Sequence, residues 1–121
     1  MALLFLYMKC IGWWQQGSVK CEMEHLYIYI KNGKINGSGI DLAGTFTFEG
    51  SIAENGGPVE MIKQYTDAHQ VRYRGMFDGK RVLTGSWSMN YLIWSDSGPW
   101  EILLPETEKA KKQLALVEEL A

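Results

Sequence analysis

The sequence predicts an all-β domain, an eight-stranded antiparallel up-and-down barrel, followed by a C-terminal α-helix. Three observations support this fold class: closely spaced turn signals, short β-prone runs between them, and a change of composition after Pro105. Asn32-Gly33 and Asp78-Gly79 are the strongest hairpin signals, because both residues of such a turn need a positive φ. Strands joined by tight turns are antiparallel neighbours. A meander of eight strands tends to close into a barrel, since closure removes both exposed edges.

The strands are predicted in the runs between these turns, where Val, Ile, Thr, Tyr, Phe and Trp suit a pleated surface. An eight-stranded barrel has room for its own side chains or for one small ligand. The barrel domain is expected to span residues 1–105. The predicted strands are Ile11–Gln15, Cys21–Lys31, Lys34–Gly39, Thr45–Ile52, Val59–Tyr65, His69–Phe77, Arg81–Met89 and Trp100–Leu104.

The two ends of the chain differ from the predicted barrel strands: the N-terminal end is strongly apolar, and the C-terminal end is rich in helix-forming residues. "MALLFLYMKC" is too short to span a bilayer, which takes about 20 residues, and it lacks the features of a secretory signal. It is therefore interpreted as a strand, on the barrel or against a partner. Residues 106–121 contain no Gly or Pro and place Leu114 and Val117 on one stripe, which predicts an amphipathic helix packed on the barrel or at an interface. Together these apolar segments predict a homodimer or larger assembly.

Composition limits the class of protein. A chain of 121 residues with 46% hydrophobic residues is one domain with a full core. The net charge is −2 and no basic cluster is visible, so a nucleic-acid partner is not expected. We expect a cytoplasmic protein without a membrane partner. Cys10 and Cys21 form no CxxC pair and lie far from both histidines, so no metal or cofactor is predicted. Two buried free thiols are expected, with a disulfide as the alternative.

Gly-x-Trp occurs three times, at Gly12–Trp14, Gly85–Trp87 and Gly98–Trp100. In a strand, residues two apart point to the same face, so each tryptophan can fill the space beside its glycine. Such tryptophans either pack the interior or form a stacking wall for a ligand. Trp14 and Trp87 are the candidates for the second role.

A strand that begins with Gly-x-Trp and leads into an antiparallel meander resembles the calycins, and among them the avidins. "GWWQQGS" resembles the opening of streptavidin-like proteins, and "KQYTDAH" and "GSWSM" resemble segments of their later strands. "GKINGSGIDLAGTFTFEG" followed by "KQYTDAHQVRYRG" is similar to small uncharacterised bacterial domains of avidin-like shape. The resemblance implies a ligand-binding barrel and covers about residues 12–89.

By position, the resemblance would place Gln15 or Gln16, Ser18 and Trp87 near a ligand. It also implies a register that turns Arg72 toward the interior. Ile62, Arg72 and Arg74 depart from the avidin pattern, in which an aromatic residue, small hydroxyls and a tryptophan are expected. Biotin is therefore not the expected ligand.

Residues 59–77 predict a hairpin with Thr66-Asp67-Ala68 as its loop. The odd-numbered face then carries Val59, Met61, Val71 and Tyr73, which suit an interior. The other face pairs Glu60 with Arg74, as on a solvent-exposed surface. Lys63, Tyr65 and His69 follow the inward face toward the loop.

A lysine inside an apolar barrel needs a partner. Asp41 and Glu49 are the candidates, although alternation with Phe46 and Phe48 turns Glu49 outward. The alternative is that Lys63 extends to solvent. The predicted ligand-binding residues are Lys63, Tyr65, His69, Tyr73, Trp14, Trp87 and Arg72.

Three functions remain open. The first is a small-molecule-binding barrel whose ligand is compact, with an anionic or carbonyl group and an apolar body. The second is a structural or interaction module with a filled core that dimerises. The third is a barrel enzyme with His/Tyr acid–base chemistry, for which no nucleophile–base pair is visible. An open cavity would favour the first over the second.

Overall fold

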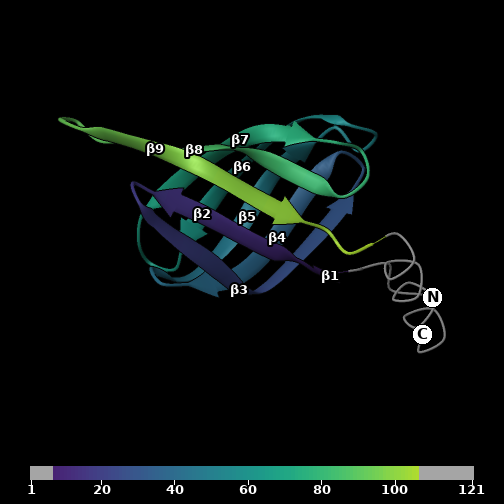
Figure 1. Ribbon diagram of the computed structural model, residues 1–121, viewed down its shortest axis with the longest axis horizontal. Coiled ribbons are helices and arrows are strands. Elements are labelled where there is room, and N and C mark those ends of the chain that lie inside the picture. Colours follow the sequence, from purple (N-terminus) through teal and green to yellow (C-terminus); the bar gives the residue numbers. More distant parts are fainter. Residues whose placement is uncertain (1–6, 107–121) are drawn as a thin grey trace.

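The computed structural model describes residues 7–106, which form an all-β barrel (Figure 1). These residues contain no α-helix, and so they contain no helix that could cross a membrane. The predicted C-terminal helix lies outside the described residues, as does most of the N-terminal apolar run. The strands are β1 (Met8–Lys9), β2 (Ile11–Gln16), β3 (Val19–Lys31), β4 (Lys34–Asp41), β5 (Gly44–Ile52), β6 (Gly57–Tyr65), β7 (Gln70–Phe77), β8 (Val82–Asn90) and β9 (Ser95–Leu103).

The barrel consists of β2 to β9, in which each strand pairs antiparallel with the next along the chain. It closes where β9 pairs with β2, for example Trp14 opposite Trp100. The short β1 pairs with the second half of β3, where Met8 lies opposite Ile28. The predicted eight-stranded up-and-down barrel is therefore confirmed.

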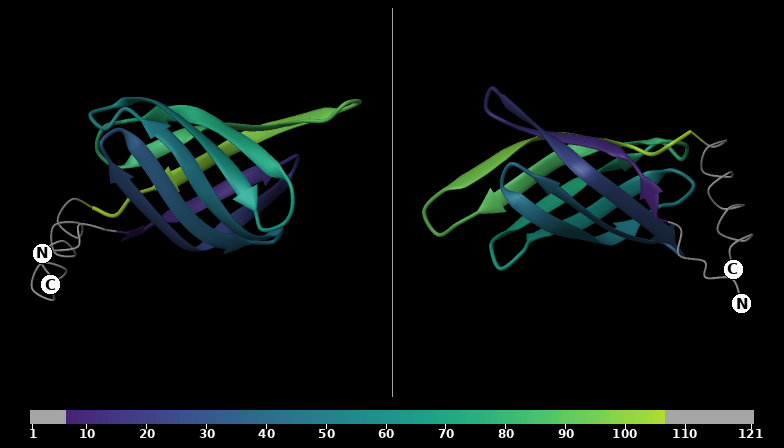
Figure 2. Two further views of the ribbon diagram at one scale, coloured as in Figure 1. Left: turned by 180° about the vertical axis from the view of Figure 1, so that it is seen from behind. Right: turned by 90° about the horizontal axis from the view of Figure 1, so that it is seen from below.

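Four turns gather at one end of the barrel, which we call the open end: β2–β3, β4–β5, β6–β7 and β8–β9. The other end, called the closed end, carries the remaining turns together with β1 and the end of β9. The β8–β9 hairpin extends well beyond the other turns of the open end (Figures 1 and 2).

The main error in the predicted strands concerns β9, which begins at Ser95 instead of Trp100. "SDSG" is typical of a loop, but here it pairs with β8, with Asn90 opposite Ser95 and Trp87 opposite Gly98. The actual turn is at Tyr91–Trp94, where the Tyr91 N–H donates to the Trp94 carbonyl at 2.8 Å. The other strand ends differ from prediction by one or two residues, which is within the usual uncertainty of strand boundaries.

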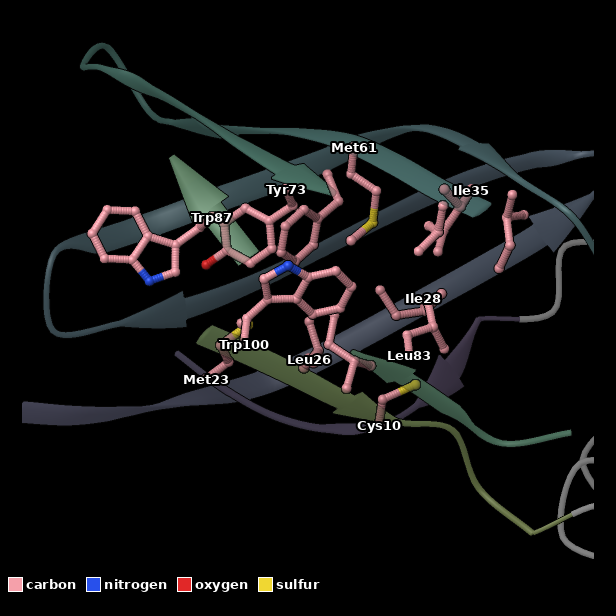
Figure 3. Packing of buried hydrophobic residues seen from close by; sticks show 14 of the residues in the cluster. Cys10, Met23, Leu26, Ile28, Ile35, Met61, Tyr73, Leu83, Trp87 and Trp100 are labelled. Atoms are coloured by element: carbon pink, nitrogen blue, oxygen red, sulfur yellow. The ribbon is translucent and has the colours of Figure 1, made fainter. Parts of the chain in front are cut away.

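The closed half of the barrel is filled by side chains of β3 to β9 (Figure 3). Leu26, Ile28, Ile35, Leu83 and Ile102 are buried there, together with Met61 and Trp100. Cys10 and Cys21 are also buried, and both are free thiols, so the alternative of a disulfide is wrong.

The second and third Gly-x-Trp motifs pack against each other, so that each indole lies over the glycine of the other motif. The expectation that each tryptophan fills the space beside its own glycine is therefore wrong. The Trp87 indole N–H donates to the Gln15 carbonyl at 2.9 Å, and it reaches that carbonyl by passing over Gly98 of β9. A Cβ at Gly98 would stand 2.8 Å from Trp87 Nε1 and would clash with the Gln15 carbonyl. Trp100 makes the equivalent bond to the Arg74 carbonyl at 3.2 Å. Gly98 and Gly85 therefore allow Trp87 and Trp100 to lie across β9 and β8.

Candidate functional site

The inward face of the β6–β7 hairpin has the predicted register. Met61 lies opposite Tyr73 and Lys63 opposite Val71, and all four side chains are buried. On the outer face, Arg74 Nε lies 2.9 Å from Glu60 Oε1. Alternation thus placed both a lysine and a tyrosine inside the barrel, as expected.

Lys63 is fully buried, with 0% of its surface exposed. Its Nζ lies 2.6 Å from Asp41 Oδ2 and donates to the Tyr73 hydroxyl at 3.2 Å. The ring of Phe46 lies beneath it, with the centroid 4.2 Å from Nζ. Burial lowers the pKa of Lys63 from 10.5 to about 8, although the Asp41 carboxylate opposes this shift. The alternative in which Lys63 extends to solvent is therefore wrong.

Asp41, the last residue of β4, is the partner that Lys63 needs. Its Oδ2 accepts three hydrogen bonds: from Lys63, from Trp14 Nε1 at 3.0 Å and from the Tyr65 hydroxyl at 2.9 Å. Its Oδ1 accepts the Ala43 N–H at 2.9 Å, which fixes the carboxylate to the β4–β5 turn. The carboxylate is thus fully occupied by donors of the protein itself. Glu49 is exposed, as expected.

Tyr73 differs from Tyr65 in where its hydroxyl proton is directed. The Tyr65 proton is donated to Asp41, whereas the Tyr73 oxygen accepts from Lys63, and its own proton has no acceptor among residues 7–106. Tyr73 is only 1% exposed. Burial raises the pKa of both tyrosines, so both remain protonated at neutral pH. Tyr73 therefore presents a buried donor, and Figure 3 shows its hydroxyl on the side that faces Trp87.

A cavity of about 280 Å³ occupies the open half of the barrel. Exposed residues of the rim and buried residues of the interior both contribute to its wall, so it reaches from the surface down to Tyr73 and Trp87. Trp14 and Trp87 meet edge to face, with ring centroids 6.1 Å apart. The lining residues are Trp14, Gln16, Ala43, Tyr65, His69, Val71, Tyr73, Trp87, Met89 and Tyr91.

Most of the predicted site residues converge on this cavity. Tyr65, Tyr73, Trp14 and Trp87 form its wall, and His69 lies exposed at its rim with its ring centroid 4.9 Å from that of Tyr65. Lys63 does not line the cavity; it lies behind the wall, in contact with Tyr65 and Tyr73.

Arg72 is the exception, because the structure places it outside the barrel. It is exposed on the outer face of β7, opposite Ile62 and Ser88. The register that the avidin resemblance implied, with Arg72 turned inward, is therefore wrong. The physical reason is that Val71 and Tyr73, its neighbours in the strand, are buried, and alternation directs Arg72 to the other face.

Several lining residues were missed by sequence reasoning. Met89 follows Trp87 by two residues on β8, so strand alternation contained a signal for it. Gln16 was not missed, since it is one of the two glutamines that the avidin resemblance placed near a ligand. Tyr91 carried no such signal, because its place depends on the course of the β8–β9 hairpin.

Comparison of the chain with protein-family models, with curated proteins and with solved structures finds no match. In the part of the chain that the structure describes, no group of three or more His, Cys, Asp or Glu side chains is placed to hold a metal ion. What the site can do must therefore be argued from its geometry.

Proposed function

We propose that the barrel binds a compact small molecule in the open-end cavity. The observation that carries the proposal is the combination of an aromatic-walled cavity with a buried hydroxyl donor that has no acceptor among the described residues. Binding pockets are typically apolar with a few convergent polar groups. A buried donor without an acceptor costs free energy, and a ligand acceptor placed there would remove this cost.

The polar group of the ligand is proposed to be a carbonyl. Tyr73 would donate its proton to the carbonyl oxygen, and the adjacent Lys63 ammonium would strengthen that bond by polarising the phenol. An anion is favoured less, because the Asp41 carboxylate already balances the charge of Lys63 at 2.6 Å. Trp14, Trp87 and Val71 would contact the apolar body of the ligand. A volume of about 280 Å³ is at the lower end of small-molecule pockets, roughly 300–1,000 Å³, so the ligand would be compact.

The test uses two isosteric probes, acetophenone and α-methylstyrene, which differ only in a carbonyl oxygen and a methylene group. Dissociation constants are measured by titration with NMR detection of backbone amides. We expect the wild-type protein to bind acetophenone roughly tenfold more tightly, since a buried hydrogen bond contributes about 1 kcal/mol or slightly more. In Tyr73→Phe this preference should fall to about twofold or less.

Tyr65→Phe is the matched control, because the Tyr65 proton is already donated to Asp41. This variant should keep the preference for acetophenone. If neither probe shifts the resonances of cavity residues, or if Tyr73→Phe keeps the full preference, the proposed site is wrong.

The alternative of an interaction module with a filled core is supported less, because a cavity remains open in the barrel beside the packed core. Acid–base catalysis is also supported less, since both cavity phenols hold their protons and His69 lies exposed at the rim. The predicted homo-oligomer depends on terminal segments outside the described residues and stays a prediction.

A further inference from the structure

The tip of the β8–β9 hairpin is the most apolar exposed surface among residues 7–106. Leu92 is fully exposed and Ile93 is 93% exposed, and they are flanked by the half-exposed rings of Tyr91 and Trp94. These four consecutive residues are called the tip. Solvent-exposed clusters of large apolar side chains usually mark an interaction site. Ligand binding in the cavity would not explain why the tip is apolar, because Tyr91 is the only residue of the tip that lines the cavity.

The tip is an ordered turn that projects from the barrel. The Tyr91 N–H donates to the Trp94 carbonyl at 2.8 Å, and the two rings lie with their centroids 4.5 Å apart. Figure 2 shows the hairpin extending past the other turns in both views. A narrow projection exposes side chains on both of its faces, and a single flat protein surface would cover only one of them. A fluid apolar medium would surround both.

Polarity changes in steps along the hairpin axis. Asn90 and Ser95 form the last strand pair, the aromatic pair Tyr91 and Trp94 comes next, and the aliphatic pair Leu92 and Ile93 is outermost. The same order occurs across a membrane surface, where polar headgroups are followed by an interface that favours Tyr and Trp and then by hydrocarbon. The tip therefore matches the polarity profile of a lipid surface.

Other turns of the open end add apolar side chains to the same rim. Leu42, in the β4–β5 turn, is 86% exposed, and Val19, at the start of β3, is also exposed. The β4–β5 turn lies across the barrel mouth from the β8–β9 turn, according to the strand order. The rim around the cavity mouth thus carries exposed apolar side chains besides those of the tip.

We propose that the open end docks on a lipid surface through the tip, with Leu92 and Ile93 inserted among the acyl chains at the headgroup boundary. The hairpin from Val82 to Leu103 contains Asp96 and Glu101 but no lysine or arginine. Insertion would therefore be driven by apolar burial and would not require anionic lipid. In this orientation the cavity mouth faces the bilayer. A membrane partner was not expected from the sequence, because four apolar residues carry no such signal until the fold places them at a projecting tip.

The experiment measures partitioning of the full chain onto phosphatidylcholine vesicles by flotation. We expect wild-type protein to float with the vesicles, and high salt should leave binding unchanged. The double variant Leu92→Ser/Ile93→Ser should lose at least about tenfold in partition coefficient. Serine is well tolerated in turns, so the hairpin should remain folded. Met76→Ser is the matched control, since Met76 is exposed on the barrel wall, away from the tip, and its loss should not change binding.

Several outcomes would overturn the proposal. Wild-type protein that stays with the aqueous fraction would do so, as would binding that survives the double variant, since another segment would then be responsible. Binding that requires phosphatidylserine and is lost in high salt would also contradict apolar insertion. If light scattering shows a dimer that the double variant dissociates, and vesicles are not bound, the tip contacts a second copy instead. None of these results depends on whether the cavity binds a carbonyl ligand.

Discussion

Asp41 and Lys63 form a buried ion pair, and a double-mutant cycle on this pair tests how the interior of the barrel is held together. The variants are Asp41→Asn, Lys63→Met and the combination of both. At an effective dielectric constant of about 20, two unit charges 2.6 Å apart attract each other by roughly 6 kcal/mol. Part of this is offset by the cost of removing both charges from water.

Each single variant is expected to lose about 3–5 kcal/mol of unfolding free energy at pH 7, the cost of a buried charge that loses its partner. For Asp41→Asn, the loss of unfolding free energy has an upper limit, because Lys63 can release its proton. Neutralising a lysine of ordinary pKa 10.5 at pH 7 costs about 5 kcal/mol, after which no buried cation remains. In Lys63→Met the stranded group is the Asp41 carboxylate.

The double variant should lose only about 1–2 kcal/mol, because the asparagine oxygen can still accept from Trp14 and Tyr65 while methionine fills the space of the lysine stem. The assay is equilibrium urea unfolding followed by tryptophan fluorescence, with the slope of each transition checked for two-state behaviour. The expected coupling energy, which is the sum of the two single losses minus the loss of the double variant, is roughly 6 kcal/mol. Additive losses in the double variant would refute the reasoning, because they would mean that the two charges do not depend on each other.

Three further results are expected. The pKa of Lys63 falls from 10.5 to about 8 on folding, so the unfolded state binds more protons between these pH values. The free energy of unfolding should therefore rise with pH over that window, by up to about 3 kcal/mol. Urea unfolding at pH 7.5 and 9.5 should show this rise in the wild type, and the double variant Asp41→Asn/Lys63→Met should lack it. Gly98→Ala should lose about 1–3 kcal/mol in thermal or urea unfolding, since its Cβ would clash with the Gln15 carbonyl, and a neutral result would contradict the packing of Trp87 across β9. Burial raises the pKa of Cys10 to about 12, so its thiol should react with Ellman's reagent at pH 7.5 only at the rate of unfolding, and immediate reaction in native protein would contradict its burial.

The barrel itself was predictable because its signals are local. Asn32-Gly33 and Asp78-Gly79 defined two hairpins, and alternation within residues 59–77 correctly placed Lys63 and Tyr73 inside and Arg74 outside. The partner of Lys63 was predictable too. Of the two candidate carboxylates, alternation turned Glu49 outward, which left Asp41. Register along a strand follows from burial of one face, and a one-residue shift would have exposed every core side chain.

Other features depend on distances between strands that are far apart in sequence. The two tyrosines are one example. The Tyr65 proton is donated to Asp41, while the Tyr73 proton has no acceptor among residues 7–106, and this difference depends on how β4, β6 and β7 are placed around Lys63. Likewise, "SDSG" has the composition of a loop, and only its pairing with β8 extends the hairpin and carries Leu92 away from the barrel. No local pattern encodes such placement.

The proposed hydrogen bond from Tyr73 to a ligand carbonyl inside the cavity can be measured directly, because it lowers the carbonyl stretching frequency of the bound probe. Isotope-edited infrared difference spectra would be recorded with acetophenone labelled with ¹³C at the carbonyl. We expect a band at lower wavenumber than in an apolar solvent, which returns to the apolar-solvent position in Tyr73→Phe and stays shifted in Tyr65→Phe. A band at the apolar-solvent position in the wild type, or a shift that Tyr73→Phe retains, would contradict the proposed hydrogen bond.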